Sequence, residues 1–598
     1  MKELYVEGVA TRNDPESCGQ HARKVLPEAL TGASMGADIE PRKHIPEADP
    51  VHVVGRHHGP SRHREARSIP AGSENRSTSR TFKHENREIP GTPVGVVRPG
   101  RAVQGPTQTT AMHVSGKSDE DVVPMSHRRP SGRGMGEGRS ETVGNPDWPT
   151  MAETPNSGPM MSGLERIRQA AMRDKGTRFT SLMHHVTPGM LEDAYRSLKK
   201  DAAAGIDGMT WTDYGEDLGT RIAALHERVQ SGRYRALPSK RAWIPKADGR
   251  MRPLGIAALE DKIVQMAMVW VLQAIYEEDF CGFSYGFRPG RSQHQALDAV
   301  WVGTVERRVN WIVDADIRSF FDTIDHGWLM KFVEHRIADT RILRLLRKWL
   351  RAGVSEKGEW SRTTVGTPQG AVISPLLANI FLHYTLDLWL KAWRNRDGTG
   401  EVIFVRYADD FVVGFQTKDS ADRFLHDLRE RMAKFALELH PDKTRLIEFG
   451  RYATANRTKR GQGKPETFNF LGFTHRCAER RKDGYFTVIR TTMAKRLGAT
   501  VKRIGKTLMK NRAQPIIEQG KWVGAAVRGW LNYHAVPGNS MAIHAFRDRV
   551  VEAWRRALRR RSQTAARGTT WEIIRTLADR FIPKPRIIHP YPNQRLVV

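Results

Sequence analysis

Two short apolar runs of this chain carry aspartates at positions where a strand would be buried. NWIVDADI places Asp314 and Asp316 at the end of a run rich in β-branched residues, and VIFVRYADDFVVGF places Asp409 and Asp410 between two apolar segments. A carboxylate in a buried strand is unfavourable unless it is paired or binds a metal. The apolar flanks of the second run predict a β-hairpin with its two acids at the tip. The alternative is a solvent-exposed tight turn, in which an Asp-Asp pair is common.

A hairpin of this kind, joined by one aspartate from a neighbouring strand, would present carboxylate oxygens to two Mg²⁺ ions a few Å apart. Two such ions can activate a 3′-hydroxyl and stabilise a leaving pyrophosphate. The residues therefore suggest phosphoryl-transfer chemistry, subject to the alternative of an exposed turn.

Composition narrows the possible partners. The 598 residues suffice for three or four domains at roughly 150 residues each. The 96 Lys and Arg exceed the 66 Asp and Glu by 30, so nucleic acid is the commonest partner to expect. The three cysteines, Cys18, Cys281 and Cys477, form no CxxC pair, which excludes a disulfide framework and suits a reducing cytosol. A secretory signal and a bilayer-length apolar stretch are both lacking, so we expect a cytoplasmic protein without a membrane partner.

The first 160 residues differ in character from the rest. Only Tyr5, Phe82 and Trp148 of the 48 aromatic residues fall in the first 150. Because a chain so poor in aromatic residues cannot bury enough apolar area to offset its entropy, we expect residues 1–160 to be a mostly disordered extension. This extension carries a net charge of only +1, so the basic excess belongs to the remaining chain.

Globular patterns begin near residue 161. They predict a long buried helix at LEDKIVQMAMVWVLQAIYEEDF, helices near 327–350 and 374–393, and strands at the two aspartate-bearing runs. This order of elements predicts an α+β fold with a mixed sheet and helices packed on it. Residues 490–562 are helical in pattern, with 17 Lys or Arg against three acids.

The YADD sequence of residues 407–410 resembles the YxDD box of reverse transcriptases. Six further blocks follow the order of that family, and their spellings resemble the group II intron reverse transcriptase/maturase family. These blocks are WIPKADGRMRPL (243–254), SYGFRPGRSQHQAL (284–297), DADIRSFFDTIDH (314–326), GTPQGAVISPLLANIFLHYTLD (366–387), HPDKTRLIEFG (440–450) and FNFLGF (468–473). The resemblance covers roughly residues 163–562.

The resemblance implies a right-hand polymerase. Residues 161–300 would form an N-terminal extension of the polymerase and the fingers, and 301–489 a palm with an antiparallel sheet. Residues 490–562 would form an all-helical thumb, or maturase domain X. Residues 563–598 would be a short tail with a possible remnant of a DNA-binding region. Because no cysteine follows Cys477, we expect the HNH endonuclease of many members to be absent.

The family pattern maps the catalytic, Mg²⁺-binding triad onto Asp316, Asp409 and Asp410. Asp314 competes for the first position, but the family's metal ligand directly precedes the Ile-x-x-Phe-Phe-Asp run, which selects Asp316. The acids that follow at 322 and 325 are expected to be structural or capping residues.

Four residues are expected to bind the incoming nucleotide. Lys246 and Arg252 stand on the two arms of a predicted hairpin and would hold the triphosphate. Phe321 resembles the residue that crowds the sugar 2′ carbon, although a core phenylalanine is the alternative. Gln369 resembles the residue that packs near the nucleotide sugar.

Other basic residues are expected to bind RNA. Arg288 and Arg291 flank a Pro-Gly turn and are predicted to contact template phosphates. Lys443 could donate a proton to pyrophosphate, but a basic residue at such a place is usually solvated, so it is not among the predicted catalytic residues. Within the basic helices, the predicted RNA-binding residues are Lys502, Arg503 and Lys506.

Two aromatic residues of the same helical segment could either pack in the core or stack on RNA bases. Trp530 is expected in the core, and Tyr533 is left open between core packing and base stacking.

The resemblance implies an RNA-directed DNA polymerase with Mg²⁺ as cofactor. Its partners would be dNTPs, an RNA template with a DNA primer, the parent group II intron RNA whose splicing it assists, and a DNA target. A splicing-only maturase and a domesticated reverse transcriptase in defence or repair remain alternatives. The oligomeric state is not predicted.

Overall fold

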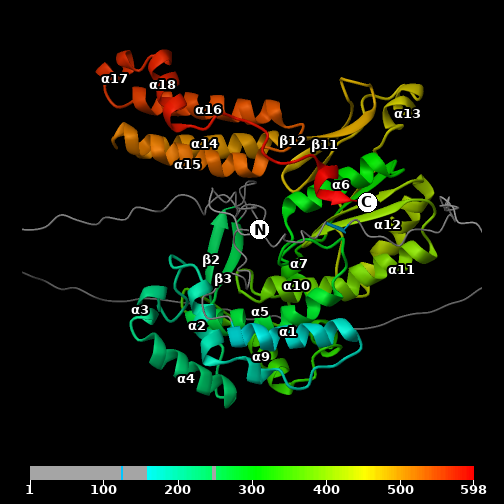
Figure 1. Cartoon of the computed structure of the whole chain (residues 1–598), viewed down its shortest axis with the longest axis vertical. Helices are drawn as coiled ribbons and strands as arrows, with labels where there is room; N and C mark the ends of the chain where they lie inside the picture. The colour runs from blue at the N-terminus through cyan, green and yellow to red at the C-terminus, as the bar shows by residue number, and fades with distance from the viewer. Residues whose placement is uncertain (1–122, 125–157, 246–250, 598) are drawn as a thin grey trace, which may run out of the picture. The chain divides into compact units, whose positions relative to one another are not determined.

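The computed structural model describes residues 123–124, 158–245 and 251–597 (Figure 1). Most of the predicted disordered extension, and the predicted triphosphate ligand Lys246, lie outside the described residues. The described part is a mixed α+β structure, as the sequence predicted. In this part of the chain no helix is both long and apolar enough to cross a membrane.

Helices make up the first described segment. The predicted apolar helix is α5 (Leu259–Asp279), and most of its side chains are buried. The elements that precede it in the chain are α1 (Gly158–Arg173), the 3₁₀ turn η3 (Met183–His185), α2 (Pro188–Ser197), α3 (Trp211–Gly215) and α4 (Leu218–Gln230). Helices α1 and α2 both contact α5. Thr187 and Thr210 cap α2 and α3 through their side chains, which satisfies backbone N–H groups at the first turn.

A four-stranded sheet follows, in the order β3-β2-β5-β6. Its strands are β2 (Ser239–Pro245), β3 (Met251–Ile256), β5 (Val354–Glu356) and β6 (Glu359–Ser361). Strands β2 and β3 are antiparallel, as the predicted hairpin requires, whereas β2 and β5 are parallel.

The sheet that carries the aspartates has the order β7-β8-β4-β9 and is antiparallel throughout. Its strands are β4 (Trp311–Asp316), β7 (Val402–Tyr407), β8 (Asp410–Phe415) and β9 (Arg445–Glu448). A third antiparallel sheet contains β10 (Phe468–Phe470), β11 (Phe473–Glu479) and β12 (Phe486–Thr492).

Further helices pack around these sheets, and most of them share one core with the first helices. Phe424 of α12, for example, packs on Phe404 and Phe415 of the β7-β8 hairpin. The elements are α6 (Gln293–Glu306), α7 (Phe320–Thr323), α8 (His326–Glu334), α9 (Thr340–Arg351), α10 (Ser374–Leu382), the π-helix η4 (His383–Asp387), α11 (Leu388–Arg396), α12 (Lys418–Ala433) and α13 (Ala453–Lys459).

The basic C-terminal region forms a helical unit with its own core. Figure 1 shows α14 (Ala494–Lys510), α15 (Ile516–His534) and α16 (Ser540–Arg559) alongside one another, and each contacts the other two. Trp530 is buried there and stacks on Phe546, with ring centroids 3.6 Å apart, which confirms its expected core position.

This helical unit continues past residue 562. After α17 (Gln563–Gly568), α18 (Trp571–Phe581) adds Ile574 and Ala578 to the same core. Helix α18 can pack this closely on α15 because position 520 is a glycine. A Cβ there would meet the Phe581 ring at 2.6 Å. The last residues form α19 (Pro592–Arg595) and β13 (Leu596–Val597), which pairs with β1 (Val123–Pro124).

Candidate active site

The antiparallel register brings the three predicted catalytic aspartates together. Asp316 ends β4 and lies directly opposite Asp410, the first residue of β8. Tyr407 pairs with Asp410, so Ala408 and Asp409 form the two-residue turn of the hairpin. Residues directly opposite in a sheet have neighbouring side chains on one face, and like charges there repel. The predicted hairpin with acids at its tip is therefore confirmed. The negative charge of its carboxylates must be offset by nearby cations.

One such cation is Lys443, which the predicted catalytic set did not include. Its Nζ lies 2.6 Å from Asp316 Oδ2, with the lysine side chain 52% exposed and the aspartate 18%. The preceding loop is fixed to the strand, because His440 N donates to Asp316 O at 2.8 Å. In the sequence, Lys443 is marked only by its place in the HPDKT block (440–444). No local pattern reveals that its side chain contacts Asp316.

The neighbouring acids have other partners. Asp314 lies on the same strand face as Asp316 but is 3.5 Å from Arg445 Nη2. Asp325 caps α8 by accepting a hydrogen bond from Trp328 N, as expected for a capping acid.

Arg252 and Gln369, both predicted to bind the nucleotide, lie in contact. Arg252 Nε donates to Gln369 Oε1 at 2.8 Å, and Gln369 Nε2 donates to Asp322 Oδ1 at 2.9 Å. Burial lowers the pKa of Arg252, while the charges of Asp409 and Asp322 oppose that shift. Arg252 is thus electrostatically coupled to the hairpin turn, and Asp322 orients the glutamine.

The backbone holds this contact in place. Gly255 N of β3 donates to Gln369 O at 2.7 Å. Gly370 has φ +113°, and a Cβ on it would meet Gly255 O at 2.8 Å. Glycine is required at Gly370 on both grounds.

Phe321 lies in the core, with 5% of its surface exposed. Its ring packs edge-on against Phe320, and its carbonyl accepts a hydrogen bond from Thr367 N at 2.8 Å. The residue is therefore joined to the loop that carries Gln369, a position compatible with either predicted role.

The placement of Arg288 contradicts its predicted contact with template phosphates. Its side chain is 4% exposed, and its guanidinium donates to Glu277 Oε2, Cys281 O and Ser284 O. A guanidinium satisfied by a carboxylate and two carbonyls inside the protein is a structural tie. Arg291 is partly exposed and donates to Gly282 O at 3.0 Å.

The predicted RNA-binding residues Lys502, Arg503 and Lys506 are all exposed on α14. Tyr533, for which the sequence allows either core packing or base stacking, is partly buried, and its hydroxyl donates to Leu471 O at 2.7 Å. This bond ties α15 to the segment before β11, so Tyr533 has a structural role.

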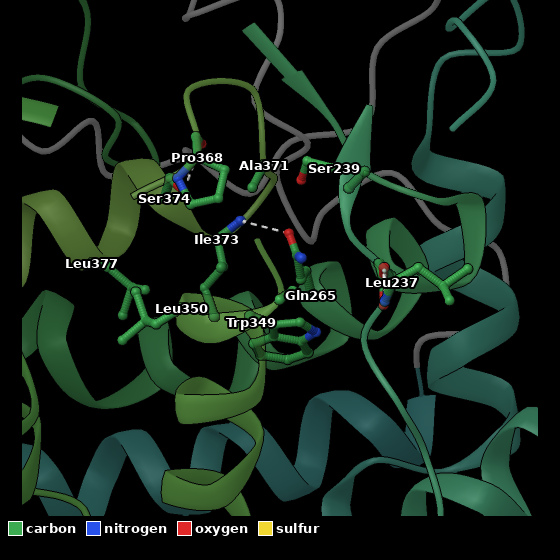
Figure 2. Close-up of a pocket in the computed structure, with 13 residues that line it drawn as sticks. Leu237, Ser239, Gln265, Trp349, Leu350, Pro368, Ala371, Ile373, Ser374 and Leu377 are labelled. Atoms are coloured by element: carbon green, nitrogen blue, oxygen red, sulfur yellow. Dashed lines mark hydrogen bonds between the residues drawn. The ribbon is translucent and has the colours of Figure 1, made fainter. Parts of the chain in front are cut away.

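Pro368, Ala371 and Ile373 line one side of a pocket (Figure 2). Trp349, Leu350 and Leu377 are among its lining residues, and Gln265 Oε1 accepts a hydrogen bond from Ile373 N at 3.4 Å. Neither Arg252 nor the three predicted catalytic aspartates are among the residues that line it, so this pocket is separate from the hairpin tip.

Carboxylate oxygens at the hairpin tip are the ligand type that Mg²⁺ prefers. Asp316, Asp409 and Asp410 are each partly exposed, so a cation from solvent can reach them. Across the residues described, no three acidic, histidine or cysteine side chains converge as a ready-made metal site. The carboxylates of Asp316 and Asp410 are on neighbouring residues of paired strands, and Lys443 forms an ion pair with Asp316.

Comparisons with known proteins agree with this geometry. Residues 244–475 match the family model described as reverse transcriptase (RNA-dependent DNA polymerase). Protein YkfC of Escherichia coli (strain K12) is 36% identical over 310 residues, which cover 46% of this chain and 81% of that protein. The chain belongs to the reverse transcriptases.

Other relatives of this reverse transcriptase are named for introns. Group II intron-encoded protein LtrA of Lactococcus lactis subsp. cremoris is 36% identical over 304 residues, 48% of either chain. The putative COX1/OXI3 intron 2 protein of Saccharomyces cerevisiae is 37% identical over 234 residues, 38% of this chain and 26% of that protein. These matches support the group II intron reverse transcriptase/maturase family. The chain spans only about half the length of LtrA.

Proposed function

We propose that this reverse transcriptase is an RNA-directed DNA polymerase encoded by a group II intron. The observation that carries the proposal is the register that sets Asp316 opposite Asp410, with Asp409 in the turn and Arg252 electrostatically coupled to it. In the right-hand arrangement, the β2-β3 hairpin belongs to the fingers, the β7-β8-β4-β9 sheet to the palm and the helical unit to the thumb.

Each side chain at the site has a distinct task in this proposal. Asp316, Asp409 and Asp410 would hold two Mg²⁺ ions, which supply activation of the primer 3′-hydroxyl and charge stabilisation on the leaving pyrophosphate. Arg252 and Lys246 bind the triphosphate, because guanidinium and ammonium groups offset its charge. Asp322 holds Gln369, which in turn holds Arg252 Nε in a fixed direction.

The partners follow from charge and from the relatives. Residues 490–562 carry a net charge of +14, which suits a polyanion. We infer that this surface binds the primer-template duplex and the parent intron RNA, that the protein assists splicing and acts on a DNA target, and that it works in the cytoplasm.

The test is primer extension on an RNA template with dNTPs. Asp409→Asn is expected to abolish extension, because the substitution removes an anionic metal ligand, while intron RNA binding and splicing persist. Asp314→Asn is the matched control, since this acid pairs with Arg445. Full extension by the Asp409 variant would overturn the metal assignment. A wild-type protein that promotes splicing without extending primers would instead indicate a splicing-only maturase.

A further inference from the structure

The turn that carries Asp409 has a strained backbone. Ala408 has φ +55°, which places a residue with a side chain in the left-handed region. Non-glycine residues rarely adopt this conformation unless their surroundings impose it. Something in the structure must therefore hold the turn.

A buried ion pair lies directly behind this turn. Arg406 of β7 forms a two-point pair with Asp387 of the π-helix η4, with N–O distances of 2.7 and 2.5 Å. The two side chains are 1% and 0% exposed. The remaining terminal nitrogen of the arginine, Nη1, donates to Ala408 O at 3.0 Å. The guanidinium thus fixes the peptide that joins Ala408 to Asp409.

Asn379 of α10 links this pair to a second contact on the turn. Its Oδ1 accepts from Arg406 Nη1 at 3.0 Å, and its Nδ2 donates to Gly286 O at 2.7 Å. The backbone of Gly286 is pressed so closely against Ala408 N that a Cβ there would overlap it. The same segment is paired with β7, because Tyr285 N donates to Arg406 O at 2.9 Å.

We propose that Arg406, Asp387 and Asn379 form a clamp that holds the Ala408-Asp409 turn in its strained conformation and so positions the metal-binding carboxylates. They are positioning residues, because they act through the turn. Burying an ion pair is costly, and the π-helix that carries Asp387 is a rare element often found at functional sites. The inference rests on the proposed function for the role of the carboxylates.

The test compares two buried arginines of similar environment. Arg406→Lys keeps the charge but cannot reproduce the forked set of hydrogen bonds. Arg336→Lys is the matched control, because Arg336 Nε is 3.1 Å from Asp279 Oδ2, with side chains 3% and 8% exposed, and it also donates to backbone carbonyls. Both variants are expected to lower the thermal unfolding midpoint.

Binding of Mn²⁺, measured by electron paramagnetic resonance of the free ion, distinguishes the two. We expect half-saturation of the Arg406→Lys protein to need roughly ten- to a hundredfold more Mn²⁺, the range for residues that orient metal ligands. The control should bind Mn²⁺ as the wild type does. The Mg²⁺ concentration for half-maximal primer extension should shift in parallel.

A milder variant covers the case in which Arg406→Lys does not fold. Asn379→Ser removes one end of the clamp and leaves the ion pair intact, so a smaller shift in the same direction is expected. Unchanged Mn²⁺ binding in the folded variants would overturn the clamp. Failure of the wild type to extend primers would overturn the proposed function instead, and the Mn²⁺ comparison would still decide the clamp.

Discussion

Lys443 Nζ lies 2.6 Å from Asp316 Oδ2, although 127 positions separate the two residues in the chain. The lysine compensates one of two carboxylates that face each other across β4 and β8. A metal ion that binds Asp316 would therefore have to displace this ammonium group or share the carboxylate with it.

Lys443→Gln removes the competing cation while keeping a polar side chain of similar length. We expect tighter binding of Mn²⁺, by up to about fivefold, because a half-exposed ion pair contributes at most about 1 kcal/mol. Titration followed by electron paramagnetic resonance measures it. Weaker binding would show that Lys443 orients Asp316 rather than competing for it.

Arg252 and Gln369 should act as one unit on the incoming nucleotide. Arg252→Ala and Gln369→Ala should each raise the KM for dNTPs, and the double variant should lose less than the sum. A coupling of about 0.5–3 kcal/mol is expected for residues in direct contact. Steady-state extension by the four proteins of the cycle measures it.

The matched pair for this cycle is Arg228 and Glu260, which share two hydrogen bonds of 2.7 and 3.0 Å. Removal of either residue should leave the KM for dNTPs unchanged. Strict additivity of the Arg252 and Gln369 effects would contradict a shared role.

Phe321→Val separates the two roles predicted for this residue. If the ring crowds the sugar 2′ carbon, the smaller side chain should raise ribonucleotide incorporation relative to deoxynucleotide by roughly 10- to 200-fold, the range for pocket discrimination. Phe320→Val is the control, since that ring is buried beside it. Equal loss of both incorporations, with a lower unfolding midpoint, would leave Phe321 a packing residue.

Local patterns predicted the elements whose signal is contained in a short stretch of chain. The apolar run of α5, the capping role of Asp325 and the hairpin with Asp409 at its tip all follow from neighbours within a few positions. The core position of Trp530 followed from helical spacing. Such signals survive folding because the relevant contacts are local or depend on one face of one element.

Contacts that depend on how separate elements pack together could not be predicted. Arg288 looked like a surface residue beside a turn, but its carboxylate partner Glu277 is on the last turn of α5, and its carbonyl partners are in the following loop. Lys443 has a typical solvated position in the sequence because its partner Asp316 lies 127 positions away, at the end of β4. The helical unit extends beyond the predicted end at residue 562 because Phe581 of α18 packs directly against Gly520 and Gly524 of α15. Hydrophobic spacing along the sequence does not reveal this packing.

His475 is expected to make the free energy of unfolding of the protein fall as the pH is lowered. Its ring is fully buried and stacks on Phe468, and within the described residues neither ring nitrogen has a hydrogen-bond partner. Burial, with the charge of Arg490, lowers its pKa from 6.5 to about 3. In the unfolded chain this histidine binds a proton below about pH 6.5, whereas in the folded chain it stays neutral down to about pH 3. Lowering the pH through this range therefore favours unfolding.

His475→Phe should remove this contribution. Between pH 7 and pH 5 the wild type should lose about 2 kcal/mol more of its free energy of unfolding than the variant does. Denaturant titration at both pH values measures the difference, and any constant packing effect cancels. Equal losses in the two proteins would mean that His475 is not a neutral buried histidine.

The exposed cations of α14 should give RNA binding its salt dependence. Releasing counterions contributes a slope of about −0.7 to −0.9 in log K against log salt for each neutralised phosphate. Replacing Lys502, Arg503 and Lys506 by alanine should therefore make the slope shallower by about 2 to 3. Filter binding of structured intron RNA across a range of salt concentrations measures it.

Loss of net charge alone would weaken binding without locating the contact, so the control must remove the same charge elsewhere. Arg423 and Arg429 on α12 and Lys434 beyond it are exposed and supply three such cations. Their replacement by alanine should leave the slope unchanged, because phosphates that they do not touch release no counterions from them. A slope that falls equally in both triple variants would mean that RNA responds to the overall field of the protein, and α14 would then not be the contact surface.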